Sequence, residues 1–348
     1  MLTIFPQAGT LFISVPSPDS RYKKVNDMAE AISNERSGVD PVSADGYRGV
    51  KHQAALRRFA IAITVLTIAG HSFLGFEQSY AQPIVAVITA YAFQLLFEWI
   101  YARGNGTRPK FYGSFSQLVD FLLPAHIAAL AITMLMYFND RLLVVVFAVA
   151  VAIASKSVLR VPTQNGSRHF FNPSNLALSV TFLLYPSVGL TMPWQWTTEI
   201  SGIGDWLFPI FIFGAGSLLH IKYASRIWVV LSFLVAFIAQ ALLRSLITDV
   251  NLLTALVPAT GVPAAIFTFY MAPDPATSPS GKLPQMMFGT SIAFVYMILV
   301  MLHIVYALFF ALTLVCLGRG IYMLTDYALH FRRVAVSNFE TRLAPVAQ

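Results

Sequence analysis

Two short polar stretches interrupt apolar parts of the chain and hold most of the side chains that could do chemistry. The first, which we call the Asn-Pro motif, reads Arg168-His169-Phe170-Phe171-Asn172-Pro173-Ser174-Asn175. The second, the Asp-Pro motif, reads Met271-Ala272-Pro273-Asp274-Pro275-Ala276-Thr277-Ser278-Pro279. Polar groups between hydrophobic segments are costly in lipid unless protein or a cavity surrounds them. We therefore expect the two motifs to form the walls of one site near the middle of a membrane protein.

The Asn-Pro motif has the composition of an anion site. Asn172 is a good helix N-cap and Pro173 suits the first helical position, so we expect a helix over residues 173–185. The free N–H groups and the positive dipole end of that helix attract phosphate or carboxylate. Arg168 and His169 add cationic donors, and the two phenylalanines offer flat apolar faces. The combination fits an anionic, aromatic ligand; the alternative is a re-entrant helix that only shapes the fold.

The Asp-Pro motif places one carboxylate between two prolines at the end of an apolar segment, where an unpaired acid is expensive. Asp274 can pair with Arg168, cap a broken helix, or bind a cation or a proton, and the sequence leaves these roles open. Thr277 and Ser278 can cap the turn that follows. The two motifs together predict a cofactor site with no catalytic residue and no metal ligand, formed by Arg168, His169, Phe171, Asn172, Ser174, Asn175, Asp274, Thr277 and Ser278.

The composition identifies the class of protein that must position these residues. The chain has 348 residues, of which 57% are hydrophobic and 11% are charged, whereas soluble domains carry about 25% charged residues. A polytopic membrane protein follows. The formal net charge of +7 then reports on orientation and not on nucleic acid, because Lys and Arg collect in cytoplasmic loops. The single cysteine, Cys316, excludes an internal disulfide and is expected to be a buried small side chain.

Ten apolar segments are candidates for the roughly 20-residue helices that span a bilayer. They are residues 59–76, 83–101, 118–138, 142–156, 173–185, 206–220, 227–246, 252–271, 283–303 and 304–323. Basic loops alternate with neutral or acidic ones, a pattern that ten spans with both termini in the cytoplasm satisfy. Three parts are expected: a cytoplasmic tail at 1–55, a transmembrane domain at 56–326 and a cytoplasmic tail at 327–348.

The order of the segments predicts an all-α fold with two halves of about five helices each. In each half a late segment meets one of the two proline-containing motifs. An odd number of spans per half turns the second half upside down, and inverted repeats with broken or re-entrant helices at the midplane are a common transporter plan. Lone polar residues in other segments are expected to be satisfied locally; these are His126, His220, Gln240 and His303.

At these residues the chain resembles the NqrB/RnfD family of membrane redox subunits, whose members belong to the sodium-pumping NADH:quinone reductase and to the Rnf ferredoxin:NAD complex. The resemblance covers residues 45–325 and rests on the two motifs, on Gly166 before the first, and on Tyr47-Arg48 with His52-Gln53. A branch of the family that is found with enediyne biosynthesis is similar in style. There the matching stretches are Phe171 to Asn175, Gln195-Trp196 and Asp274 to Pro279.

The resemblance implies a ten-helix fold of two inverted halves, a location in the bacterial inner membrane, and partner subunits of a redox complex. It also implies flavin, either FMN or riboflavin, and transmembrane electron transfer. In the family, FMN is linked to the threonine of a Ser-Gly-Ala-Thr element, where this chain has Ser201-Gly202-Ile203-Gly204. Gly204 has no hydroxyl, so the expected flavin is non-covalent and lies between the two motifs. Two alternatives remain: a transporter or channel for a small solute on the same fold, and a structural or assembly subunit without cofactor.

Overall fold

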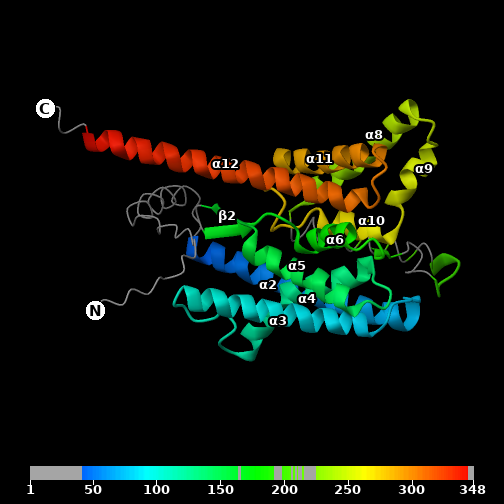
Figure 1. The fold of residues 1–348 in the computed structure, drawn as a ribbon, viewed down its shortest axis with the longest axis horizontal. Coiled ribbons are helices and arrows are strands. Elements are labelled where there is room, and N and C mark those ends of the chain that lie inside the picture. The colour runs from blue at the N-terminus through cyan, green and yellow to red at the C-terminus, as the bar shows by residue number, and fades with distance from the viewer. Residues whose placement is uncertain are drawn as a thin grey trace, which may run out of the picture. The chain divides into compact units, whose positions relative to one another are not determined.

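The computed structural model describes residues 41–163, 166–191, 198–204, 207, 210, 214 and 225–343, most of which are helical (Figure 1). Within these ranges five helices are long and apolar enough to cross a membrane, and a bent pair of helices can form a sixth span. The prediction of a mainly helical protein with several apolar helices of membrane-spanning length is therefore confirmed, and this architecture is consistent with a membrane protein. The prediction of ten spans stays a prediction, since most of the segment 206–220 lies outside the described residues.

The five long apolar helices lie where the hydropathy pattern placed them. They are α3 (Ala81–Gly104), α4 (Phe115–Leu135), α8 (Ile227–Ile247), α11 (Lys282–Met301) and α12 (Ala307–Leu343), in which the apolar part is Ala307–His330. Three further elements cover other predicted segments: α2 (Pro41–Ala69) with the π-turn η1 (Gly70–Leu74), α5 (Leu142–Val158) and α6 (Pro173–Leu184).

The segment expected to run unbroken over residues 252–271 is divided in two. Helix α9 (Leu252–Leu256) continues into η4 (Val257–Ala259), and α10 (Val262–Ile266) continues into η5 (Phe267–Met271). The two parts are bent by 62°, whereas the hydropathy pattern predicts a break only after Met271. Proline lacks the N–H that a helix interior requires and is tolerated in the first turn, which is where Pro263 lies in α10. A new helix therefore begins here, and the chain turns before it at Thr260 and Gly261.

Two short antiparallel strand pairs were not predicted. Strand β1 (Met136–Tyr137) pairs with β4 (Gly189–Leu190), and β2 (Arg160–Thr163) pairs with β3 (Gly166–His169). The second pair sets Arg160 opposite His169 at the entrance to the Asn-Pro motif. Its hydrogen bonds satisfy the backbone N–H and C=O groups of the segment between α5 and α6. Unpaired groups of this kind would be costly inside a membrane.

Helix packing within Gln53–Gln348 falls into two groups that meet at α6 and α12. In one group α3, α4, α5 and α6 pack against one another, and in the other α8 packs against α11, which packs against α12. Figure 1 shows α6 between α5 and the long helix α12. The two groups share one hydrophobic core, which includes buried residues of α5, α6 and α12. The Asn-Pro motif therefore begins a helix at the seam between the two groups.

His126 is satisfied locally, as predicted. Its Nε2 lies 2.8 Å from Thr64 Oγ1, and its Nδ1 lies 2.9 Å from the Tyr91 hydroxyl. Since the Thr64 hydroxyl donates to Ala60 O, it accepts from the protonated Nε2, and Nδ1 accepts from Tyr91. Gln240 differs, because its buried amide has no hydrogen-bond partner in the described part of the chain. His303 lies on the exposed turn after α11, and His220 is outside the described residues.

Candidate functional site

Asn172 caps helix α6, as the sequence predicts. Its backbone is extended, with φ −66° and ψ 121°, and its Oδ1 accepts a hydrogen bond of 2.9 Å from Asn175 N. Pro173 occupies the first turn, where its missing N–H costs nothing. The preceding rings of Phe170 and Phe171 lie 4.6 Å apart and are both 7% exposed. These rings therefore belong to the core that holds the start of α6.

The two motifs meet directly, although Asn172 and Asp274 are 102 positions apart. Asn172 Nδ2 donates to Met271 O at 3.3 Å and to Asp274 Oδ2 at 3.4 Å. Arg168 Nη2 donates to Ala276 O at 2.6 Å. The amide of Asn172 therefore closes the cap of α6 with its oxygen and holds the Asp-Pro motif with its nitrogen.

Asp274 organises the turn that follows it. Its Oδ1 accepts from Ala276 N at 3.0 Å, and its Oδ2 accepts from Thr277 Oγ1 at 3.1 Å. The Ser278 hydroxyl donates to Asp274 O at 2.7 Å. Thr277 and Ser278 are 1% and 0% exposed, so this turn is built into the protein. Of the roles that the sequence left open, the structure shows a related one: the carboxylate closes a turn at 274–278, but no helix begins there. The ion pair with Arg168, another of those roles, is not formed, since that guanidinium donates to a carbonyl instead.

Three arginines from different parts of the fold converge on the same turn. Arg168 in β3 binds Ala276 O, Arg319 in α12 donates to Thr277 O at 2.6 Å, and Arg226 before α8 donates to Ser278 Oγ at 3.1 Å. We call these three side chains the arginine cluster. The three positive charges repel one another. Each guanidinium donates a hydrogen bond to a carbonyl or hydroxyl oxygen of the turn. In the described residues none of the three forms an ion pair with a carboxylate.

Excess positive charge marks the surroundings of the cluster. Burial and the neighbouring Arg168 both lower the pKa of Arg226, which Asp274 opposes. Arg160 in β2 and Lys156 in α5 lie close by, because both act electrostatically on His169 together with Arg168 and Asp274. Such a group of charges is stabilised by an anion that enters among them. The site can therefore bind a phosphate or a carboxylate.

His169 does not contribute a charge at neutral pH, contrary to expectation. Burial, together with the cations Lys156, Arg160 and Arg168, lowers the pKa of His169 to about 4, while Asp274 opposes the shift. A histidine with its pKa below its ordinary value is neutral at pH 7 and becomes charged only when the pH falls through that pKa. The sequence predicts a cationic role for this residue because spacing alone does not show its burial.

Asn175 and Ser174 lie in the first turn of α6 and are both buried. Asn175 Nδ2 donates to Phe309 O at 3.0 Å and to Thr313 Oγ1 at 2.8 Å. Its Oδ1 accepts no hydrogen bond from the described residues, although Asn175 is only 2% exposed. A buried acceptor without a donor is costly, so a ligand N–H or O–H at this point would satisfy it.

Helix α12 forms one continuous side of the site. Phe309, Thr313 and Gly320 contact the Asn-Pro motif, while Arg319 contacts the Asp-Pro motif. Spacings of four and seven residues repeat on one helix face, so Phe309, Thr313 and Gly320 face the Asn-Pro motif along about three turns, while Arg319 lies on the neighbouring face. Arg319 and Arg226 were not predicted as site residues. An arginine within an otherwise apolar segment was the available signal for Arg319, because such residues are rare in spans and usually functional.

Replacing Gly320 by alanine is expected to destabilise the protein, whereas Gly318→Ala is expected to be neutral or stabilising. A Cβ at Gly320 would overlap the ring of Phe170, but a Cβ at Gly318 meets nothing within 4 Å. Overpacking a core costs about 1–3 kcal/mol, and removing a helical glycine returns about 1 kcal/mol. Thermal unfolding of both purified variants in one detergent measures the difference. Equal midpoints for the two variants would show that α12 does not hold the Asn-Pro motif in this way.

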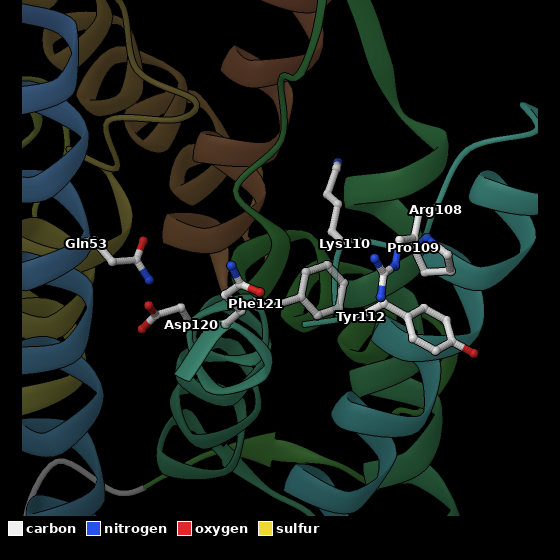
Figure 2. A pocket seen from close by; sticks show the side chains of 8 residues that line it. Gln53, Arg108, Pro109, Lys110, Tyr112, Asp120 and Phe121 are labelled. Carbon is white, nitrogen blue, oxygen red and sulfur yellow. The ribbon is translucent and has the colours of Figure 1, made fainter. Parts of the chain in front are cut away.

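A cavity lies elsewhere in the structure, at the start of α4 (Figure 2). Its volume is about 510 Å³, and none of its lining residues belongs to either motif; they are Gln53, Arg108, Pro109, Lys110, Tyr112, Gln117, Asp120 and Phe121.

Comparison of the chain with protein-family models and with curated proteins finds no match. The resemblance to membrane redox subunits is thus still a prediction.

Proposed function

We propose that the chain is a membrane protein that binds a flavin non-covalently between the Asn-Pro and Asp-Pro motifs and serves as the membrane subunit of an electron-transfer system. The observation that carries the proposal is the arginine cluster, in which Arg168, Arg226 and Arg319 converge on one turn without a carboxylate partner among the described residues. This arrangement suits FMN, which carries a phosphate, better than riboflavin, which lacks one.

The residues present fit such a ligand at two points. The arginine cluster would hold the phosphate, and the free Oδ1 of Asn175 would accept a hydrogen bond from a polar edge of the ring system. A bound flavin supplies one- and two-electron transfer, and the protein positions it and tunes its potential. Asn172 and Asp274 keep the two walls of the site together. No residue of the chain is assigned a catalytic role.

The proposal includes the finer architecture: ten helices in two inverted halves, in a bacterial inner membrane, with both termini in the cytoplasm and with partner subunits of a redox complex. The alternation of basic and neutral loops supports this orientation. The bent span and the start of α6, which is capped by Asn172, meet at the two motifs and support the plan of interrupted helices.

A second function, transport of a small anionic solute, is favoured by the same interrupted helices. Transporters of this plan bind substrates at half-helix ends near the midplane. In this alternative the arginine cluster would bind the solute, and no cofactor would be present. A structural or assembly role is the third possibility.

The flavin content of the purified protein distinguishes the flavin-binding subunit from the transporter and the structural subunit. The protein, extracted in mild detergent and purified, is expected to carry about one flavin per chain, visible by absorbance and fluorescence. Acid precipitation should release the flavin into the supernatant, since Gly204 leaves no hydroxyl for a phosphoester at that position. A colourless protein that does not bind added FMN would refute the flavin proposal, and uptake of anions into vesicles would then support transport.

A further inference from the structure

We infer that the cavity between α2, α4 and the loop after α3 binds the headgroup of an anionic phospholipid, with Arg108 and Lys110 as its phosphate ligands. This binding is independent of the proposed flavin, because none of the cavity residues belongs to the two motifs.

The cavity lies at the ends of two membrane-spanning helices. The loop of residues 105–114 connects Gly104, the last residue of α3, with Phe115, the first residue of α4. Large aromatic side chains are exposed at this level, namely Trp99, Tyr101, Tyr112 and Phe115. Exposed aromatic rings at the ends of spanning helices are typical of the membrane–water interface. The cavity is therefore at the depth of lipid headgroups.

The lining carries more positive than negative charge that is open to a ligand. Asp120 is engaged by Arg57, whose Nε and Nη2 donate to the two carboxylate oxygens at 2.6 and 2.7 Å. Lys110 Nζ is 3.8 Å from Glu98, and its side chain remains 71% exposed. Arg108 forms no ion pair in the described residues and lies 5.8 Å from the centre of the Tyr112 ring. An incoming phosphate thus meets Arg108, which has no carboxylate partner in the described residues, and Lys110, whose long ion pair with Glu98 leaves the ammonium exposed; Asp120 is already held by Arg57.

The walls of the cavity are held in place before any ligand binds. Ser114 and Gln117 form a capping box at the start of α4, with hydrogen bonds of 3.1 and 3.3 Å. A Cβ at Gly113 would fall on Gln117 Oε1, so the loop packs closely against this cap. Figure 2 shows Gln53 and Asp120 on one side of the cavity and Arg108, Pro109 and Tyr112 on the other. Preformed sites lose less free energy to ordering when they bind.

The surroundings favour a lipid over a free phosphate. Only 17% of the apolar window of α3 is buried, and Leu96 and Ile100 on its last turns are 46% and 51% exposed. Acyl chains can lie along this face while the headgroup enters the cavity. The volume of about 510 Å³ suits one small headgroup.

Lipid binding to the purified full-length protein in detergent tests the inference. Phosphatidylglycerol is titrated against phosphatidylcholine with the same acyl chains, and thermal stability and native mass spectrometry report binding. We expect saturable stabilisation by phosphatidylglycerol only. The double variant Arg108→Ala/Lys110→Ala should bind it roughly 20-fold more weakly, since each Lys or Arg near the surface contributes about fivefold. The matched control Arg103→Ala, at the same membrane level but outside the lining, should lose little.

Three outcomes would overturn the inference. They are equal stabilisation by both lipids, an unchanged affinity of the double variant, and full stabilisation by inorganic phosphate without lipid, which would assign the cavity to a soluble anion. The single variant Arg108→Gln keeps the test decisive if the double variant does not fold, because it retains most of the side chain and removes one charge.

Discussion

Replacing Asn172 by alanine is expected to lower the free energy of unfolding by about 2–4 kcal/mol. A lost N-cap costs about 1 kcal/mol, and each of the two further hydrogen bonds that are lost contributes about 0.5–1.5 kcal/mol. Three partners lose their bond to Asn172 at once: Asn175 N, Met271 O and Asp274 Oδ2. Thermal or denaturant unfolding of the purified variant in a constant detergent measures the loss.

Asn251→Ala provides the matched control for this prediction. Asn251 caps the short helix α9, where its Oδ1 accepts from Leu253 N at 2.8 Å, and the residue is exposed. The expected cost is about 1 kcal/mol or less, since only a cap is removed. If both substitutions cost the same, the contact between the two motifs adds nothing to stability and the joined site is not supported.

Replacing Arg168 by alanine is expected to weaken FMN binding by about tenfold to a hundredfold, because a hydrogen bond to a charged group contributes about 1.5–3 kcal/mol. Arg168→Lys should restore part of the affinity, since it keeps the charge but loses the second donor of the guanidinium. Equilibrium titration with FMN fluorescence measures both values.

Arg141→Ala controls for the loss of one exposed arginine elsewhere. Its guanidinium donates to Ser187 Oγ at 2.7 Å and takes no part in the arginine cluster. This variant should bind FMN like the wild type. The assignment of Arg168 to the phosphate would be wrong if Arg168→Ala weakened riboflavin binding as much as FMN binding, because the loss would then come from the fold and not from the charge.

Local sequence was enough to predict the cap of α6 and the long apolar helices. Asn172 and Pro173 act through neighbours in the chain, and apolar length alone identifies helices such as α4 and α8. Pro263 was a local signal for the break at Gly261. The break was not predicted, because the residues on both sides are apolar and the segment was identified by its apolar length.

The arginine cluster could not be predicted, because it depends on which loops the fold brings together. Arg226 and Arg319 lie in different segments from Arg168, and only packing shows that all three reach residues 276–278. The same is true of the neutral state of His169, which follows from its burial among cations. Sequence patterns give the chemical types available, whereas tertiary contacts decide their distances and charges.

The proposed function depends on a phosphate site that Arg168, Arg226 and Arg319 would form between two interrupted helices. The most direct test compares the affinities of the wild-type protein for FMN and riboflavin, which differ only in the phosphate. We expect binding of both, with FMN at least about tenfold tighter, because charge-assisted contacts to a phosphate add to its affinity. Equal affinities for the two flavins, or no binding of either, would contradict the claim.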